Sequence, residues 1–109
     1  MTRRATNDVV VIMWRDIPAQ VNGQAGRHRH QVLLSPKFQR AIDRAKRKAK
    51  IYTAQEDVAQ WRRVSEPVDG DLESAAQSAA ERLEGEYSTE RLGRLAFSGG
   101  WEQKGEATA

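Results

Sequence analysis

The strongest hydrophobic run of the chain lies near its N-terminus and predicts a β-strand. Six apolar residues follow one another from Val9 onward, and the first four are β-branched. A continuous apolar run of this length is typical of a strand that is central in its sheet or covered on both faces. Arg15 and Asp16 end the run, and Pro18 has no N–H to donate to a continuing central ladder. We therefore predict a strand over residues 9–15.

The next segment, Asp16–Gly26, predicts a long loop that projects beyond the sheet. It is about twice as long as the usual hairpin connection of roughly 2–5 residues. It also contains Asn22 and Gly23, a pair that favours a tight turn because both residues tolerate positive φ. A tighter hairpin that closes at this pair, with residues 19–21 continuing the first strand beyond a proline bulge, is the alternative. In both cases the segment is available for binding.

Residues 27–34 predict the return strand, and a helix follows it directly. Ser35 and Pro36 indicate the helix start, with serine as N-cap and proline at the first helical position. Apolar residues at helical spacing from Phe38 onward predict a helix over residues 36–50. The opposite face of this helix carries a candidate basic patch, which consists of Lys37, Arg40, Arg44, Arg47 and Lys48.

The second half of the chain predicts one short strand and one further long helix. Thr53 and Glu56 match a capping box, which indicates a short helical turn. A short strand over residues 61–65 follows, although residues 58–64 also fit one face of a helix, and that alternative stays open. The last long helix, over residues 71–86, begins at an aspartate N-cap and carries a narrow apolar stripe of alanines.

Together these elements predict an α+β fold, a two-layer sandwich with the chain order ββαβα. The strand over residues 9–15 pairs with the strand over residues 28–34 in a small antiparallel sheet. The helices over residues 36–50 and 71–86 cover one face of that sheet. The predicted core consists of Val9, Val11, Met13, Val32, Leu34, Phe38, Ile42, Ala45, Trp61, Ala76, Ala79 and Leu83.

The length and composition indicate a single small domain. The chain has 109 residues, of which 39% are apolar and 30% charged, enough for one modest core. We expect a domain over residues 8–88, a flexible N-terminus over residues 1–7, and a tail over residues 89–109 that is disordered beyond Gly100. The longest apolar run is far shorter than the ~20 residues of a membrane-spanning helix. The N-terminus has no signal-type hydrophobic region, so we expect a cytoplasmic protein without membrane contact.

Residues of the kinds used in catalytic and metal sites are few. The absence of cysteine excludes disulfides and thiolate chemistry. His28 and His30 are two apart on a predicted strand and so share a face, but no acidic residue at a telling spacing supplies a third metal ligand. Neither a nucleophile motif nor a glycine-rich phosphate loop is present. Asp16 is a lone loop carboxylate of the kind that usually caps a turn. We therefore predict no catalytic residue, no metal and no cofactor.

The charge is divided unequally along the chain. Residues 1–50 hold 12 Lys and Arg against 3 Asp and Glu, a net charge of +9, whereas residues 51–109 hold 6 against 12, a net charge of −6. Charged helix faces of opposite sign that complement each other within one fold are one explanation. The basic patch also suits nucleic acid, but no RNA-binding motif accompanies it. An acidic protein face or a phosphorylated ligand explains the patch equally well.

Four segments of the chain resemble a known family. They are VIMWRDIPAQV, RHRHQVLL, SPKFQRAIDRAKRKA and VAQWRR, within residues 8–88. They resemble the small bacterial domain family named virulence factor, which occurs as short stand-alone proteins and as the C-terminal part of conserved virulence factor C proteins. That family brings no established catalytic residues to carry over. Its stand-alone members are associated by genomic setting with cobalamin-dependent methyl transfer to methionine. The resemblance thus implies an accessory role beside corrinoid methyltransferase machinery.

Two functional hypotheses follow. The favoured one is a non-catalytic accessory or protein-interaction module that binds through the Asp16–Gly26 loop and its flanking arginines. The candidate interaction surface consists of Arg15, Asp16, Gln20, Asn22, Arg27 and Arg29. The alternative is a nucleic-acid-binding domain that uses the basic patch of the helix over residues 36–50.

Overall fold

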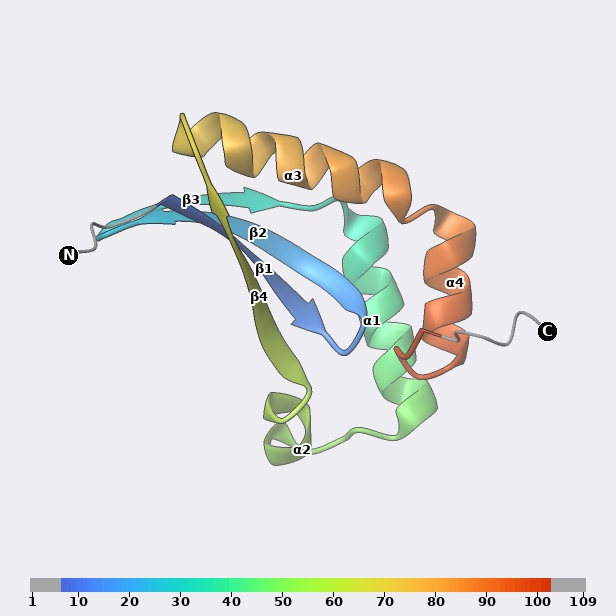
Figure 1. The fold of residues 1–109 in the computed structure, drawn as a ribbon. Helices are drawn as coiled ribbons and strands as arrows, with labels where there is room; N and C mark the ends of the chain where they lie inside the picture. Colours follow the sequence, from blue (N-terminus) through green and yellow to red (C-terminus); the bar gives the residue numbers. More distant parts are fainter. Residues whose placement is uncertain (1–6, 103–109) are drawn as a thin grey trace.

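The computed structural model describes residues 7–102, which form one antiparallel sheet of four strands together with four helices (Figure 1). The α+β fold class predicted from the sequence is confirmed. In chain order the elements are β1 (Asn7–Trp14), β2 (Ile17–Ala25), β3 (His28–Leu33), α1 (Pro36–Ala49), α2 (Ala54–Val58), β4 (Trp61–Val68), α3 (Leu72–Glu86) and α4 (Thr89–Phe97). No helix among these described residues is long and apolar enough to cross a membrane.

The sheet has the strand order β3-β2-β1-β4, so β1 lies in its interior. Every residue of β1 pairs on both sides: Val10, for example, lies opposite Asn22 of β2 and Ser65 of β4. The continuous apolar run therefore has the central position that its pattern predicted. The edge strands are β3 and β4, and β4 contains Pro67, a residue that is tolerated at a sheet edge.

The predicted loop over residues 16–26 is wrong, and so is the alternative hairpin at Asn22 and Gly23, because this segment is strand β2. The predicted pairing of residues 9–15 with residues 28–34 is wrong for the same reason, since β2 lies between them. The chain reverses instead at Arg15–Asp16, and Arg15 has a left-handed φ of 53°.

Local features of β2 explain how its turn-forming residues fit into a strand. The pairing with β1 shifts between Ile12 and Met13, so Ala19 is bulged out of the ladder. Strand β3 pairs with β2 only from Gln20 onward, so no strand lies beside Pro18 on that side and no ladder hydrogen bond is lost there. Gly23 is needed for packing rather than for a turn, because an added Cβ would lie 2.9 Å from Leu72 Cγ of α3.

Helices α1, α2 and α3 follow the sequence prediction closely. Helix α1 begins after the N-cap Ser35 with proline in its first turn, and it ends at Lys50, which has a left-handed φ of 59°. Thr53 and Glu56 form the predicted capping box at the start of α2. At the start of α3, the Asp71 side chain accepts a hydrogen bond from the backbone N–H of Ser74. That hydrogen bond lowers the pKa of the Asp71 carboxyl, because it favours the charged form.

The core divides into two buried clusters, one beneath α3 and one beneath α1 and α4. The first consists of Val9, Val21, Ala76, Ala79, Ala80 and Leu83. The second consists of Trp14, Ile17, Phe38, Ala41, Ile42, Ala45, Leu92, Leu95 and Ala96. Of the predicted core residues, Val11, Val32, Leu34 and Trp61 are only partly buried, and the others are buried. Figure 1 shows α1 and α3 on one side of the sheet, with α4 outside α1.

Helix α4 extends the packed part of the chain past residue 88, where the sequence indicated only a tail. Leu92 and Leu95 of α4 are each 2% exposed, so this helix is part of the core. The expected disorder beyond Gly100 falls on residues 103–109, and most of the expected flexible N-terminus falls on residues 1–6; both stretches lie outside the described residues.

Candidate functional site

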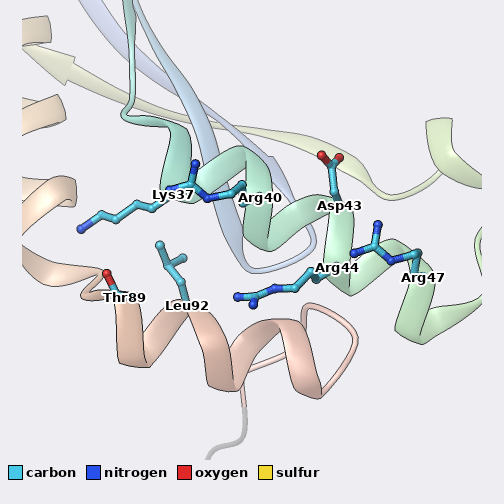
Figure 2. Close-up of a pocket in the computed structure, with 7 residues that line it drawn as sticks. All are labelled: Lys37, Arg40, Asp43, Arg44, Arg47, Thr89 and Leu92. Atoms are coloured by element: carbon cyan, nitrogen blue, oxygen red, sulfur yellow. The ribbon is translucent and has the colours of Figure 1, made fainter.

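A groove between α1 and α4 brings the predicted basic patch together with residues from the C-terminal part of the chain. The two helices lie against each other along their length (Figure 1). At one end of their contact is a cavity of about 400 Å³. Figure 2 shows the seven side chains that line it, which are Lys37, Arg40, Asp43, Arg44, Arg47, Thr89 and Leu92. We refer to this cavity and its surroundings as the basic groove.

Helical periodicity explains why the arginines gather on one wall. Arg40, Arg44 and Arg47 are spaced i, i+4 and i+7 along α1, so they lie on the same face. The buried face of the same helix carries Phe38 and Ile42. The other wall is provided by α4, whose N-cap is Ser88. Thr89 and Leu92 are the residues of α4 that line the cavity.

The positive charge of the groove is largely uncompensated. No carboxylate among residues 7–102 lies within 4.0 Å of a charged nitrogen of Arg40, Arg44 or Arg47. Asp43 is the acidic residue of the lining; it accepts a hydrogen bond from Gln39, and Figure 2 shows it pointing away from α4. Lys37, in contrast, lies 3.8 Å from Glu84 of α3. The three arginines are therefore available to an external anion.

A second hollow of about 410 Å³ continues the groove toward the end of α4. It is lined by Arg44, Arg47 and Lys48 from α1 and by Phe97 from α4, among others. The Phe97 side chain is 73% exposed, and Lys48 Nζ lies 4.3 Å from the centre of its ring. All five residues of the predicted basic patch thus lie along one groove. Sequence reasoning missed Thr89 and Phe97 as part of it, because it assigned residues 89–109 to a tail.

The structure does not bring the six residues of the predicted interaction surface together. Arg15 and Asp16 form the turn between β1 and β2, whereas Arg27 and Arg29 lie at or just after the turn between β2 and β3. These turns are at opposite ends of β2, whose nine residues span roughly 26 Å at ~3.3 Å per residue. Gln20 and Asn22 lie within β2 itself, where Gln20 also accepts a hydrogen bond from Gln31 of β3.

Arg15 is engaged within the molecule rather than free for a partner. Its Nε donates to Gln60 Oε1 at 2.9 Å, and its Nη1 donates to the carbonyl oxygen of Gly99 at 2.9 Å. The guanidinium carbon lies 5.1 Å from the ring centre of Trp14 and 5.0 Å from that of Trp101. Arginine between two aromatic rings is a favourable cation–π arrangement. Arg15 therefore joins the first turn of the sheet to the segment after α4.

Asp16 makes three polar contacts with residues that are distant in the chain. One carboxylate oxygen lies 3.0 Å from Arg62 Nη2 of β4, and the other accepts a hydrogen bond from the backbone N–H of Glu102 at 2.7 Å. Its own backbone N–H donates to the carbonyl oxygen of Gly100. The expected turn-capping role of a loop aspartate is thus extended to two distant segments.

The neighbouring Trp14 is fixed by a carboxylate from α2. Its indole N–H donates to Asp57 Oδ1 at 2.8 Å, and the indole N–H of Trp61 donates to Asp57 Oδ2 at 3.2 Å. Lys46 Nζ of α1 lies 3.0 Å from Asp57 Oδ1. Burial acts to raise the pKa of Asp57, but the hydrogen bonds from Lys46, Trp14 and Trp61 outweigh it and hold the pKa below its ordinary value.

The two histidines do not assemble a metal centre. His28 is exposed at the start of β3, and His30 Nδ1 lies 3.6 Å from Glu73 of α3. Within residues 7–102, no cluster of three or more histidine and acidic side chains is arranged to hold a metal ion. The basic groove is therefore the strongest candidate binding site in the described part of the chain.

Comparison with known families gives one match. The sequence model of a family described as Virulence factor matches residues 12–96, from within β1 to the last turn of α4. No curated protein and no solved structure matches the chain.

Proposed function

The chain belongs to the Virulence factor family, and from that premise we propose that it is a non-catalytic docking module that binds an acidic segment of a protein partner in the basic groove. The observation that supports this proposal most directly is the state of Arg40, Arg44 and Arg47. They share one face of α1, line one cavity, and have no carboxylate within 4.0 Å in residues 7–102.

The chemistry of the groove favours a polypeptide carboxylate as the ligand. Arginine presents a planar fork of donors that matches a carboxylate in a bidentate arrangement. Phe97 supplies a large exposed apolar surface further along the groove. A segment that alternates acidic and apolar residues would pair with both kinds of surface. Such a mixed surface is typical of protein recognition, in which charges steer association and apolar groups hold the complex.

A pair of charge-reversal variants tests the site of binding. The first variant carries Arg40→Glu and Arg44→Glu on α1, and the matched variant carries Arg27→Glu and Arg29→Glu at the β2–β3 end of the sheet. Both variants change the net charge by the same amount, and all four positions are exposed. Tagged proteins would be used to recover partners from a lysate of the source organism, and the partners would be quantified by mass spectrometry.

We expect the α1 variant to lose its partner by 10-fold or more and the matched variant to retain it. Loss of the partner in the matched variant alone would contradict binding in the basic groove and would support the interaction surface predicted from the sequence. Equal partner recovery by the wild type and by both variants would refute docking through either basic surface.

Single-stranded nucleic acid is a second candidate ligand, favoured by the exposed Phe97 ring beside Lys48. Single-strand binders combine a basic groove with aromatic rings on which bases stack. Fluorescence anisotropy with labelled RNA and DNA at several salt concentrations tests it, with Phe97→Ala and the Arg40→Glu, Arg44→Glu variant. Binding that weakens steeply with salt and with both changes would support this candidate. Absence of binding at low salt would refute it.

The cellular setting that the resemblance implies is also a proposal. We propose that the docking partner belongs to the corrinoid machinery for methyl transfer to methionine, either the methyltransferase itself or the system that reactivates it. Deletion of the gene tests this directly. A methionine requirement, relieved by the wild-type gene and not by the Arg40→Glu, Arg44→Glu variant, is the expected result. Normal growth of the deletion strain without methionine, under conditions in which the cobalamin-dependent enzyme is essential, would contradict it.

A further inference from the structure

Strand β4 forms an open edge of the sheet. It pairs with β1 on one side, and no strand among residues 7–102 pairs with its other side. The six residues from Arg62 to Pro67 are all exposed, because α1 and α3 pack on β1, β2 and β3 instead. An open strand of eight residues presents a row of main-chain donors and acceptors, to which another strand can be added.

The ladder with β1 determines which main-chain groups of β4 face the open edge. The N–H of Arg15 donates to the carbonyl oxygen of Gln60 at 3.0 Å. This hydrogen bond lies one residue beyond the ladder pair of Trp14 and Trp61. Hydrogen-bonded and non-hydrogen-bonded pairs alternate along an antiparallel ladder, so every second residue of β4 bonds to β1 and the residues between them face outward. The outward residues are Trp61, Arg63, Ser65 and Pro67.

The side chains of β4 are self-complementary about Val64. Arg62, Val64 and Glu66 lie on one face of the strand. If two copies of β4 run antiparallel with Val64 opposite Val64, Arg62 of each copy lies opposite Glu66 of the other. Val64 is 44% exposed, and this register covers it with its own counterpart. Within residues 7–102, Glu66 has no ion pair and Nη1 of Arg62 makes no polar contact.

We propose that β4 is a homodimerisation edge, at which two copies of the chain pair antiparallel about Val64 and join their sheets into one. The main chain suits this register. Arg63 of each copy lies opposite Ser65 of the other, and the outward groups of these two residues form hydrogen-bonded pairs. The side chains of Arg62, Val64 and Glu66 fall at the non-hydrogen-bonded positions, where neighbouring strands bring side chains closest together. A twofold interface requires this kind of self-complementarity.

The neighbouring registers fit less well. A twofold axis at Arg63 places the two copies of that arginine opposite each other, and like charges directly opposite are destabilising. An axis at Ser65 places the apolar Val64 opposite the charged Glu66. It also places Arg63 opposite Pro67, which has no N–H to donate. The register about Val64 therefore pairs opposite charges and apolar surface at the same time.

Two charge-reversal variants of the chain test this register. Arg62→Glu and Glu66→Arg, each alone, place like charges opposite each other at both ends of the pairing. In a heterodimer of the two variants, both of these positions again pair opposite charges. Ser65→Pro removes an outward N–H and leaves the ladder with β1 in place. Glu81→Arg, at an exposed position of α3, is the matched control for charge.

Sedimentation velocity over a range of protein concentrations measures the dimer. We expect the wild type and Glu81→Arg to dimerise with the same dissociation constant. Each reversal alone, and Ser65→Pro, should raise that constant roughly 10-fold or more. The mixture of the two reversal variants should form a heterodimer roughly 10-fold tighter than either homodimer. Hydrogen exchange at the N–H groups of Arg63 and Ser65 should slow as the dimer forms.

A wild type that stays monomeric up to about 1 mM overturns the proposal. A dimer that persists unchanged in the folded Glu66→Arg and Ser65→Pro variants also overturns it, because β4 is then not the interface. These two variants decide even if Arg62→Glu unfolds through loss of its contact with Asp16. Absence of heterodimer in a mixture of folded reversal variants overturns the register. None of these results bears on the basic groove, which is lined by residues of α1 and α4.

Discussion

The carboxylate of Asp57 is expected to contribute more to stability than its place in a five-residue helix indicates. It accepts the indole N–H of Trp14 at 2.8 Å and that of Trp61 at 3.2 Å, and it lies 3.0 Å from Lys46 Nζ. Trp14 is 0% exposed, so its N–H has no access to water if the acceptor is removed. Asp57→Ala therefore leaves a buried donor without a partner.

The magnitude follows from the three contacts. An unsatisfied buried donor costs about 1–3 kcal/mol. Trp61 and Lys46 are only partly buried, so water replaces part of what they lose, and each adds up to roughly 0.5–1 kcal/mol. We expect Asp57→Ala to lower the free energy of unfolding by about 2–4 kcal/mol. Asp69→Ala, at an exposed position between β4 and α3, is the matched control and should change it by less than about 0.5 kcal/mol.

Urea denaturation at pH 7, followed by circular dichroism, measures both changes. Because the pKa of Asp57 is lowered in the folded state, its contribution is complete above the ordinary aspartate pKa near 4 and is lost as the pH falls through the lower folded value. The difference between wild type and Asp57→Ala should therefore narrow below about pH 4. A loss under 1 kcal/mol at pH 7, or a difference that widens in acid, would refute this account of the carboxylate.

Further expectations concern the packing of β2 and the capping of α2. Gly23→Ala should lower the free energy of unfolding by about 1–3 kcal/mol, because the new Cβ would press on Leu72. Gly85→Ala, in an open part of α3, should raise the free energy of unfolding by up to about 1 kcal/mol. Urea denaturation should therefore show changes of opposite sign in the two variants. Ile17→Ala should cost about 2–5 kcal/mol in the same assay, because this side chain is 0% exposed, and a cost typical of a surface loop would contradict the strand. Thr53→Ala, which removes the capping box of α2, should lower the free energy of unfolding by about 1 kcal/mol. An unchanged melting temperature would contradict this role of the cap.

Features with local causes were predictable from the sequence. Helix α1 was placed to within one residue because Ser35, Pro36 and the apolar spacing all lie within the helix or next to it. Strand β2 was missed because Pro18 and the pair Asn22-Gly23 signal a turn locally. What overrides that signal is tertiary: a bulge opposite β1, the absence of β3 beside the proline, and the approach of α3 to the glycine.

The candidate site likewise combines features with local causes and features that depend on tertiary packing. The basic wall of the groove was predictable because it is one face of one helix. The second wall was not, since it depends on how α4 packs on α1, and no pattern within either helix specifies that pairing. The role of Arg15 was also beyond local reasoning, because its partner Gly99 lies 84 residues away in the chain. Sequence patterns thus identified which residues are basic and exposed, whereas the structure shows which of them face one another.

The central position of β1 has a consequence for biosynthesis. Its inner partner β2 follows at once, but its other partner is distant: Trp14 pairs with Trp61, 47 residues later. At a synthesis rate of about 5–20 residues per second, that interval lasts roughly 2–9 s. During it the β1–β2–β3 hairpins can form, yet one edge of the most apolar strand stays unpaired. A newly made chain is therefore most prone to aggregation before residues 61–68 emerge, and a pause in translation or a bound chaperone would matter most in that interval.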